Sequence, residues 1–332
     1  MQTSRPSTVA RWARFHSQIR RQFRRKLRGR AWLPFWLLLP SLIVIGLIQL
    51  YPAFYTFVLS TQRTEAGTGR MIFVGMDNFA RLLTSTAFIQ SLWHTLFFLG
   101  GYVLLTMTLA LGIALLLRAR VRLRPLYITL LFIPWVISDV IAGVVWRLFV
   151  VPDYGQFAPF FANPARFGEP NGISILTSPA RDQLSLYIPF PPAPALIFLI
   201  FAAAWKVLPF ITLLMLAALQ TVPREVQESA AIDGATGWQA LRFITLPLIL
   251  PMLTVALFNL TLGGINGVGM VLSLTGGGPG NATEVLSYLL YSTGFSMLDF
   301  GLAGALSVVL AVINFALILF TLRTARAYEG HI

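Results

Sequence analysis

Six long apolar segments constrain this chain more than any other feature of its sequence. A transmembrane helix needs about 20 mostly apolar residues. Six stretches of the 332-residue chain meet that requirement, at about 32–59, 88–117, 125–150, 194–220, 244–274 and 300–322. Because 56% of the residues are hydrophobic and only 11% are charged, the chain is far more apolar than a soluble domain. The sequence therefore predicts an all-α integral membrane protein with six transmembrane helices.

The charge of the chain is concentrated at its N-terminus. Ten of the 25 lysines and arginines fall within the first 30 residues, with no acidic residue among them. A nucleic-acid-binding arm is one interpretation of such a run. The run leads directly into an apolar span, however, so the positive-inside rule explains it more simply and predicts a cytoplasmic N-terminus with no nucleic-acid partner. Apolar residues at spacings of three or four predict that residues 1–31 lie as an amphipathic helix on membrane lipid, with plain disorder as the alternative.

The loops agree with that orientation. With six spans, both termini face the cytoplasm, and a cytoplasmic tail of 323–332 follows the membrane domain of 32–322. Arginines mark the inner side, where they precede the third span and follow the sixth (Arg118, Arg120, Arg122, Arg124, Arg323 and Arg326). The 151–193 loop then lies outside, and its eight prolines exclude a long helix. The loop is either an irregular external cap that serves as a docking surface or a simple tether between spans.

Several classes of chemistry have no support in the sequence. The chain has no cysteine, and its three histidines (His16, His94 and His331) are too scattered for a metal site. The sequence contains no pair of carboxylates and no nucleophile–base pattern that would predict an enzyme. No G-x-x-x-x-G-K-[ST] occurs, and the glycines at 276–280 lack the lysine of a phosphate-binding loop. We expect no cofactor on this chain, and any ATP hydrolysis on another subunit.

The connection between the fourth and fifth spans, residues 221–247, carries its own helix signals. Pro223 suits a helix start, and Asp233-Gly234 predicts a stop, because glycine adopts the left-handed conformation at a helix end. Thr236 with Gln239 forms a capping-box pattern, which predicts a second helix through Phe243. The expected result is a cytoplasmic helix-turn-helix.

This helix-turn-helix is longer than a turn between spans requires. Ser229 and Ala230 predict a low-profile surface on its first helix, and Glu228 offers a charge to a basic partner. We therefore favour a docking element over a merely structural loop.

The same residues resemble a known motif. Glu228, Ser229-Ala230, Asp233-Gly234 and the segment ending in Leu246-Pro247 are similar to the cytoplasmic motif of binding-protein-dependent ABC importer permeases. The resemblance implies that this loop is a coupling helix that fits a groove on an ATPase. Ser229 stands where alanine is usual, which exchanges one small residue for another.

The resemblance extends over most of the chain and narrows to the maltose-type larger permease subunit of sugar importers. It is carried by residues 49–52, 73–79, 146–147, 274–279 and 281–284. It implies a second permease subunit, two ATPase subunits that use ATP and Mg, an extracytoplasmic solute-binding protein, and a sugar substrate. It also implies a bacterial-type cytoplasmic membrane. Val268-Gly269 depart from the usual aromatic-Asp pair, and the 151–193 loop is unusually long, so neither feature identifies the sugar.

One acidic residue and one lysine lie deep in the predicted spans. Asp139 and Lys206 lie at similar depths, 15 and 14 residues from the predicted cytoplasmic ends of their segments, which is a difference of about 1.5 Å at helical rise. Charged side chains within spans usually face an aqueous path. We expect the two to pair or jointly to line the substrate pathway. The alternative is that Lys206 merely occupies the usual Trp-Lys position of the family and does not pair with Asp139.

Further polar and aromatic residues predict the rest of the pathway. Asn259 and Asn266 are two helical turns apart, with Gly263 between them, so all three share one face of the fifth span. Amides suit hydroxyl-rich ligands, while the glycine either leaves room for a ligand or lets helices pack closely. Trp205 either stacks on a sugar ring or packs in the core or at the membrane interface.

The sequence thus predicts a permease subunit of an ATP-driven importer for a sugar or related polyol. A secondary transporter or channel without an ATPase partner is the alternative, but it would need more charged relay residues in its spans than Asp139 and Lys206.

Overall fold

The computed structural model describes residues 33–64, 70–118, 122–150, 155–156 and 193–329. The predicted surface helix over 1–31 and nearly all of the predicted 151–193 loop lie outside these ranges and stay predictions. The chain divides into two units, Met1–Val58 and Leu59–Ile332, and each is described by itself.

The first unit carries one apolar helical run. It consists of α2 (Leu33–Ile45), the π-helical turn η1 (Gly46–Leu50) and α3 (Tyr51–Ser60), whose last two residues belong to the second unit. In η1 the N–H of Tyr51 reaches the carbonyl of Gly46, directly before Pro52. A proline has no N–H to donate, and a wider turn accommodates its ring. The run keeps enough length to span a membrane, over Phe35–Ser60.

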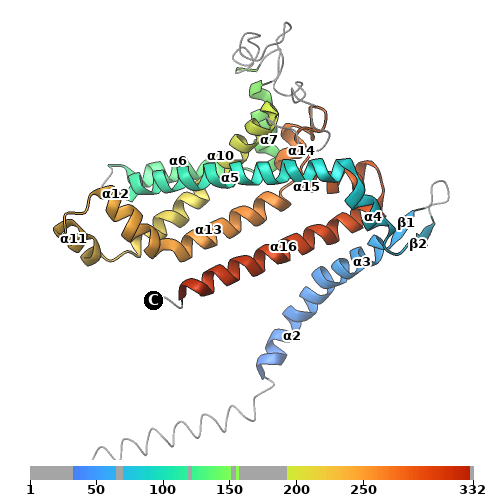
Figure 1. Ribbon diagram of the computed structural model, residues 1–332, viewed down its shortest axis with the longest axis horizontal. Helices are drawn as coiled ribbons and strands as arrows, with labels where there is room; N and C mark the ends of the chain where they lie inside the picture. The colour runs from blue at the N-terminus through green and yellow to red at the C-terminus, as the bar shows by residue number, and fades with distance from the viewer. Residues whose placement is uncertain (1–32, 65–69, 119–121, 151–154, 157–192, 330–332) are drawn as a thin grey trace, which may run out of the picture. The chain divides into compact units, whose positions relative to one another are not determined.

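The second unit begins with a small hairpin and is otherwise helical (Figure 1). Strands β1 (Gln62–Thr64) and β2 (Met71–Phe73) pair antiparallel, a feature that the sequence reasoning missed. The helical elements are α4 (Asp77–Thr84), α5 (Thr86–Arg118), α6 (Arg124–Val136), α7 (Asp139–Val150), α10 (Pro194–Gln220), α11 (Arg224–Ile232), α12 (Gly237–Ala240), η2 (Leu241–Thr245), α13 (Leu246–Asn266), α14 (Gly269–Leu274), α15 (Leu286–Tyr291), η3 (Ser292–Ser296) and α16 (Phe300–Glu329).

A buried asparagine ties the hairpin to the helices. The side-chain amide of Asn78 on α4 donates to the carbonyls of Ser60, at 2.9 Å, and of Gln62, at 2.7 Å. These carbonyls end α3 and begin β1, so one side chain satisfies two backbone acceptors where the regular structure changes.

The predicted number of spans agrees with the structure. Within the described residues, five helices are long and apolar enough to cross a membrane, and a sixth span results if α6 and α7 count as one. Apart from the β1–β2 hairpin, the regular structure of the described residues is α-helical and π-helical, as expected of an all-α membrane protein. Threonine hydroxyls inside these helices donate to the carbonyl four residues earlier, which satisfies them without water.

Two predicted spans are broken rather than continuous. The segment predicted at 125–150 bends by 96° between α6 and α7. The segment predicted at 244–274 ends at Asn266, and α14 begins separately at Gly269. Hydropathy averages over a window and does not register a local break, which is why the sequence reasoning expected two straight helices.

The core lies where α5 and α10 pack along one another (Figure 1). Small residues let the helices approach closely, and Ala110 and Ala114 on α5 and Ala202 on α10 are fully buried. Larger buried side chains of α10 fill the remaining space (Leu196, Leu199, Ile211, Met215 and Leu219). This packing fixes α10 as the support for the polar residues described below.

Close packing at a glycine also joins α7 to α14. A Cβ built on Gly143 would lie 1.9 Å from Oγ of Ser273 and 3.2 Å from the backbone N of Leu274. Because the second atom belongs to the backbone, rotation of the serine alone does not create enough room.

We expect Gly143→Ala to destabilise the protein by about 1–3 kcal/mol, since overpacking forces the two helices apart. Thermal unfolding of the purified protein in detergent, followed by tryptophan fluorescence, measures the effect. Gly112→Ala on α5 is the matched control, because a Cβ there meets nothing within 4 Å. Equal melting temperatures for the two variants would contradict the packing argument.

Candidate functional site

The predicted helix-turn-helix connects α10 to α13 over residues 221–247 and is called the helical hairpin, or simply the hairpin, from here on. Its turns follow the predicted signals. Helix α11 begins after Pro223 and ends at Ile232, and Gly234 adopts a left-handed φ of +77°. The capping box is complete: Oε1 of Gln239 accepts from the N–H of Thr236 at 2.7 Å, and Oγ1 of Thr236 accepts from the N–H of Gln239 at 3.3 Å. The predicted second helix does not end at Phe243, however, because α12 continues through η2 into α13.

The hairpin surface differs from the expected one. Glu228, Ser229 and Asp233 are exposed, as is Pro247, whereas Leu246 is partly buried. Ala230 is only 5% exposed, so it is buried and does not belong to an open surface.

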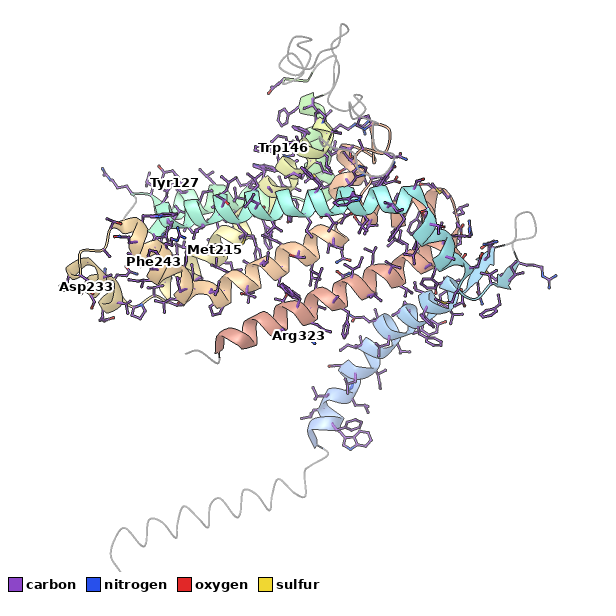
Figure 2. All side chains as sticks on the ribbon, in the orientation of Figure 1. Tyr127, Trp146, Met215, Asp233, Phe243 and Arg323 are labelled. Atoms are coloured by element: carbon purple, nitrogen blue, oxygen red, sulfur yellow. The ribbon has the colours of Figure 1, made fainter. Side chains whose placement is uncertain are left out.

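The sequence reasoning missed three large apolar side chains on this hairpin. Ile232 is 85% exposed, Trp238 65% and Phe243 68%. Figure 2 shows Asp233 and Phe243 in this part of the second unit. Their signal in the sequence was the presence of bulky apolar residues in an otherwise polar connection. An exposed group of this kind is typical of a contact surface.

A second site forms at the break between α6 and α7. Asp139 is the first residue of α7, so its carboxylate lies at a helix N-terminus and not 15 residues inside one continuous helix. The partial positive charge of a helix N-terminus stabilises a carboxylate. Nζ of Lys206 on α10 lies 2.7 Å from Oδ1 of Asp139, so the hypothesised pair is present.

This pair borders a cavity of about 200 Å³. Phe98 and Tyr102 on α5 contribute stacked rings, with centroids 5.5 Å apart. Gly263 on α13 also lines the cavity, and a Cβ there would meet nothing within 4 Å. Packing among the described residues of this chain therefore does not require glycine at 263, and the open space lies beside the cavity.

The other predicted pathway residues lie outside that lining. Trp205 packs edge-to-face on Trp146 of α7, with ring centroids 5.4 Å apart, inside an aromatic cluster. Asn259 is exposed on α13. Asn266 exchanges amide hydrogen bonds with Asn314 of α16, at 3.3 and 3.1 Å. Asn314 was missed by the sequence reasoning, although an amide in an apolar span was a usable signal.

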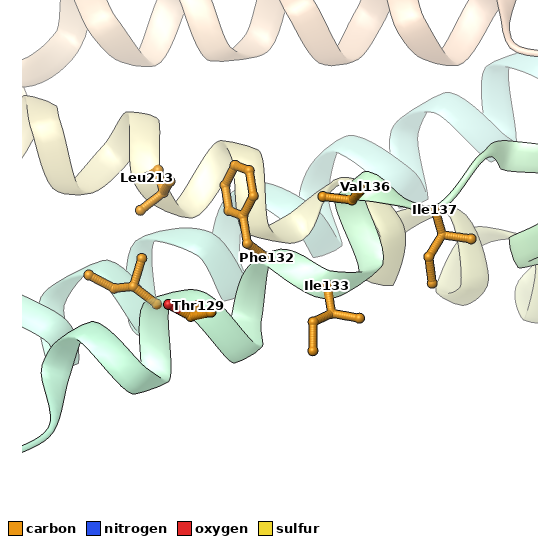
Figure 3. Close-up of a pocket in the computed structure, with 7 residues that line it drawn as sticks. Thr129, Phe132, Ile133, Val136, Ile137 and Leu213 are labelled. Carbon is orange, nitrogen blue, oxygen red and sulfur yellow. The ribbon is translucent and has the colours of Figure 1, made fainter.

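A larger cavity of about 700 Å³ lies along α6 and α10 and is apolar (Figure 3). Among the described residues that line it, the one hydroxyl is that of Thr129, which donates to the carbonyl of Pro125. With its polar group already satisfied, this cavity lacks the convergent polar side chains that orient a polar ligand.

The glycine-rich segment after α14 is held by α5. Nδ1 of His94 lies 3.2 Å from the carbonyl of Glu284, and Oγ1 of Thr95 accepts from the N–H of Leu286 at 2.8 Å. Gly277 has a φ of +81°, and a Cβ there would lie 2.5 Å from Cε1 of Tyr288. Gly277 therefore serves a tight turn against an aromatic ring.

Glu284 is a buried carboxylate in this segment. Burial raises its pKa above the ordinary value, and a hydrogen bond with the hydroxyl of Ser292 offsets part of that rise. Its charged form is therefore the costly one in the folded protein.

The comparisons with known proteins agree with this architecture. Residues 107–328 match the family described as binding-protein-dependent transport system inner membrane component. The trehalose/maltose transport system permease protein MalF of Thermococcus litoralis is 32% identical over 91% of this chain and 96% of its own length. The sn-glycerol-3-phosphate transport system permease protein UgpA of Agrobacterium fabrum is 32% identical, with 88% and 94% covered.

Solved structures show the same fold. A bacterial ABC transporter involved in the import of the acidic polysaccharide alginate has a TM-score of 0.70 and 25% identity, covering 92% of this chain and 99% of its own. A bacterial alginate ABC transporter in complex with its alginate pentasaccharide-bound periplasmic protein has a TM-score of 0.70 and 26% identity, covering 91% and 96%.

We expect stability to fall as the pH rises from the ordinary carboxyl pKa through the raised pKa of Glu284, because over that window the folded protein binds the proton more tightly than the unfolded chain. Glu284→Gln should remove this part of the pH dependence and unfold at a higher temperature than the wild type above that window. Melting temperatures of the wild type and the variant at several pH values measure this pH dependence. Glu225→Gln, on the exposed surface of α11, is the control, and an unchanged pH slope in Glu284→Gln would contradict the assignment.

We also expect charge reversal at either Asp139 or Lys206 to lower the uptake of cargo by the reconstituted transporter complex by about tenfold or more. Each single change places like charges together in a partly buried site. The exchange Asp139→Lys with Lys206→Asp should recover a substantial part of that loss. Uptake by the reconstituted complex, at matched protein levels, measures the coupling. If the double variant recovers nothing, the pair is not a functional unit.

Proposed function

The chain belongs to the family of binding-protein-dependent transport system inner membrane components, and from this membership we propose that it is the membrane-spanning permease subunit of an ATP-driven importer for a sugar or related polyol. The hairpin between α10 and α13 is the observation that carries the ATP-driven part of the proposal. Its helix stop, its capping box and its exposed apolar side chains together form a surface suited to a partner protein.

The sugar assignment is supported by the relatives. Their names refer to trehalose and maltose, to sn-glycerol 3-phosphate and to alginate, which are carbohydrates or a phosphorylated polyol. The relatives include neutral and acidic cargoes, so these names leave the charge of the cargo open.

The hairpin is proposed to dock on an ATPase subunit. Glu228 and Asp233 offer charge on its exposed surface, while Ile232, Trp238 and Phe243 offer apolar contact area. Leu246 and Pro247 join it directly to α13, and the helix is continuous from Gly237 to Asn266. Movement of the docked hairpin would thus be transmitted to the span that borders the Asp139–Lys206 cavity.

The remaining subunits follow from the same proposal. ATP and Mg would be used by two partner ATPase subunits, and a second permease would complete the membrane portion. An extracytoplasmic binding protein would deliver the cargo, as the complex of the alginate transporter with its periplasmic protein illustrates. The positive-inside pattern supports a cytoplasmic position for both termini and the hairpin. The membrane is proposed to be a bacterial-type cytoplasmic membrane.

The cargo pathway is proposed to follow α10 and α13. Asp139, Lys206 and Gly263 border the cavity, and the Asn266–Asn314 amide pair adds further hydrogen-bonding groups between α13 and α16. Asn259 and Trp205 remain candidates that lie outside the cavity lining. Amide and carboxylate groups suit the hydroxyls of a carbohydrate.

We expect Gly234→Trp and Glu228→Lys each to reduce ATP-driven uptake by about tenfold or more. A bulky residue at a left-handed position strains the turn, and a reversed charge disfavours the partner's basic groups. ATP-dependent uptake into vesicles containing the complete complex, together with copurification of the ATPase, measures this.

Gly112→Trp on α5 is the control for the added bulk, because a Cβ there meets nothing within 4 Å. Normal ATPase association and uptake in both hairpin variants would show that the hairpin is only a connection, and the coupling proposal would fail.

A further inference from the structure

The cavity beside the helix break has a particular charge balance. Among the described residues that line it, Asp139 and Lys206 are the two that carry charge, and they pair at 2.7 Å. Arg147, the next cation along α7, is eight residues further on, about 12 Å along the helix axis. The net charge of the described residues that line the cavity is therefore zero.

The two charges are not equally accessible. The side chain of Lys206 is 19% exposed, whereas that of Asp139 is 50% exposed. A group entering the cavity therefore meets the carboxylate more readily than the ammonium. An anionic cargo would meet a like charge there, and it could reach the ammonium only by displacing the carboxylate from its partner.

A neutral polyhydroxyl ligand meets no such obstacle. The free lone pairs of the Asp139 carboxylate accept hydrogen bonds from hydroxyls, and the remaining N–H groups of Lys206 can donate to hydroxyl oxygens. The stacked rings of Phe98 and Tyr102 and the open space beside Gly263 supply apolar surface and room. This combination suits the alternating polar and apolar surface of an uncharged sugar.

We propose that this permease carries an uncharged sugar or polyol, and that the Asp139–Lys206 pair excludes phosphorylated and carboxylated cargo. The inference rests on the proposed function, because it identifies the charge class of the cargo in the same pathway. In this view the carboxylate of Asp139 balances the positive charge of Lys206. Asp139 thereby determines the specificity for neutral cargo.

The test compares matched neutral and anionic probes. Radiolabelled trehalose and trehalose 6-phosphate, and glucose and glucuronate, are bound to the purified complex without its binding protein, so that the selectivity of that protein does not enter. In the wild type we expect the neutral member of each pair to bind about tenfold more tightly or better. Copurification and activity of the ATPase are recorded in the same samples.

Two variants separate charge selection from structural damage. Asp139→Asn leaves the ammonium of Lys206 without its counter-charge, so we expect the affinity for the anionic probes to rise by about tenfold. Lys206→Gln breaks the same pair but leaves the carboxylate, so the anionic probes should remain excluded. Damage to the fold alone would lower the binding of every probe, so it would not produce a gain in affinity for the anionic probes.

Several outcomes would overturn the inference while leaving the importer proposal intact. These are tighter binding of the anionic probes by the wild type, an unchanged preference in Asp139→Asn, and the same response in both variants. Binding of neither probe class by a complex with active ATPase would also overturn it, because the pair would then not face the cargo. Loss of ATPase association from the wild-type complex is the separate result that would count against the proposed function.

Discussion

Backbone hydrogen bonding inside a membrane is the constraint on which the rest of this structure depends. Lipid offers no partner to a free N–H or C=O, so a spanning segment stays helical unless protein groups satisfy its broken ends. The third and fifth spans are nevertheless interrupted, near residues 137–138 and 267–268. Hydroxyl groups help to satisfy both breaks: Oγ of Ser138 accepts from the N–H of Ile141, and Oγ of Ser287 donates to the carbonyl of Gly267.

The breaks create the polar site because they bring helix ends together. Asp139 begins α7, and a Cβ on Gly269, which begins α14, would lie 2.9 Å from Cβ of Asp139. The contact of Gly143 with Ser273 holds the same two helices together one turn further on. Lys206 reaches this point from α10, whose own position is fixed by its packing against α5. The ion pair thus depends on backbone breaks, on glycine contacts and on a close-packed helix pair at once.

The hairpin between α10 and α13 shows the opposite arrangement. The membrane spans place a few polar groups in apolar surroundings, whereas the hairpin places large apolar side chains in a polar connection. Ile232 on α11, Trp238 on α12 and Phe243 in η2 are all exposed. An exposed position of this kind is stable where a partner covers it. The continuous helix from Gly237 to Asn266 then links that surface to the interior of the membrane domain.

The sequence by itself determined the features that depend on composition or on residues within about one helical turn. The spans were readable because their length and apolar character must match the membrane, and the hairpin turns were readable because the Thr236–Gln239 capping box and the left-handed Gly234 are local. Equal depth along two predicted helices was enough to suggest the pair of Asp139 and Lys206. Only the tertiary structure decided the 96° break, the burial of Ala230 and the pairing of Asn266 with Asn314, which is 48 residues away. The Asn266–Asn314 pair joins two distant segments, and neither a hydropathy window nor a local motif contains the bend angle or the burial of a single alanine.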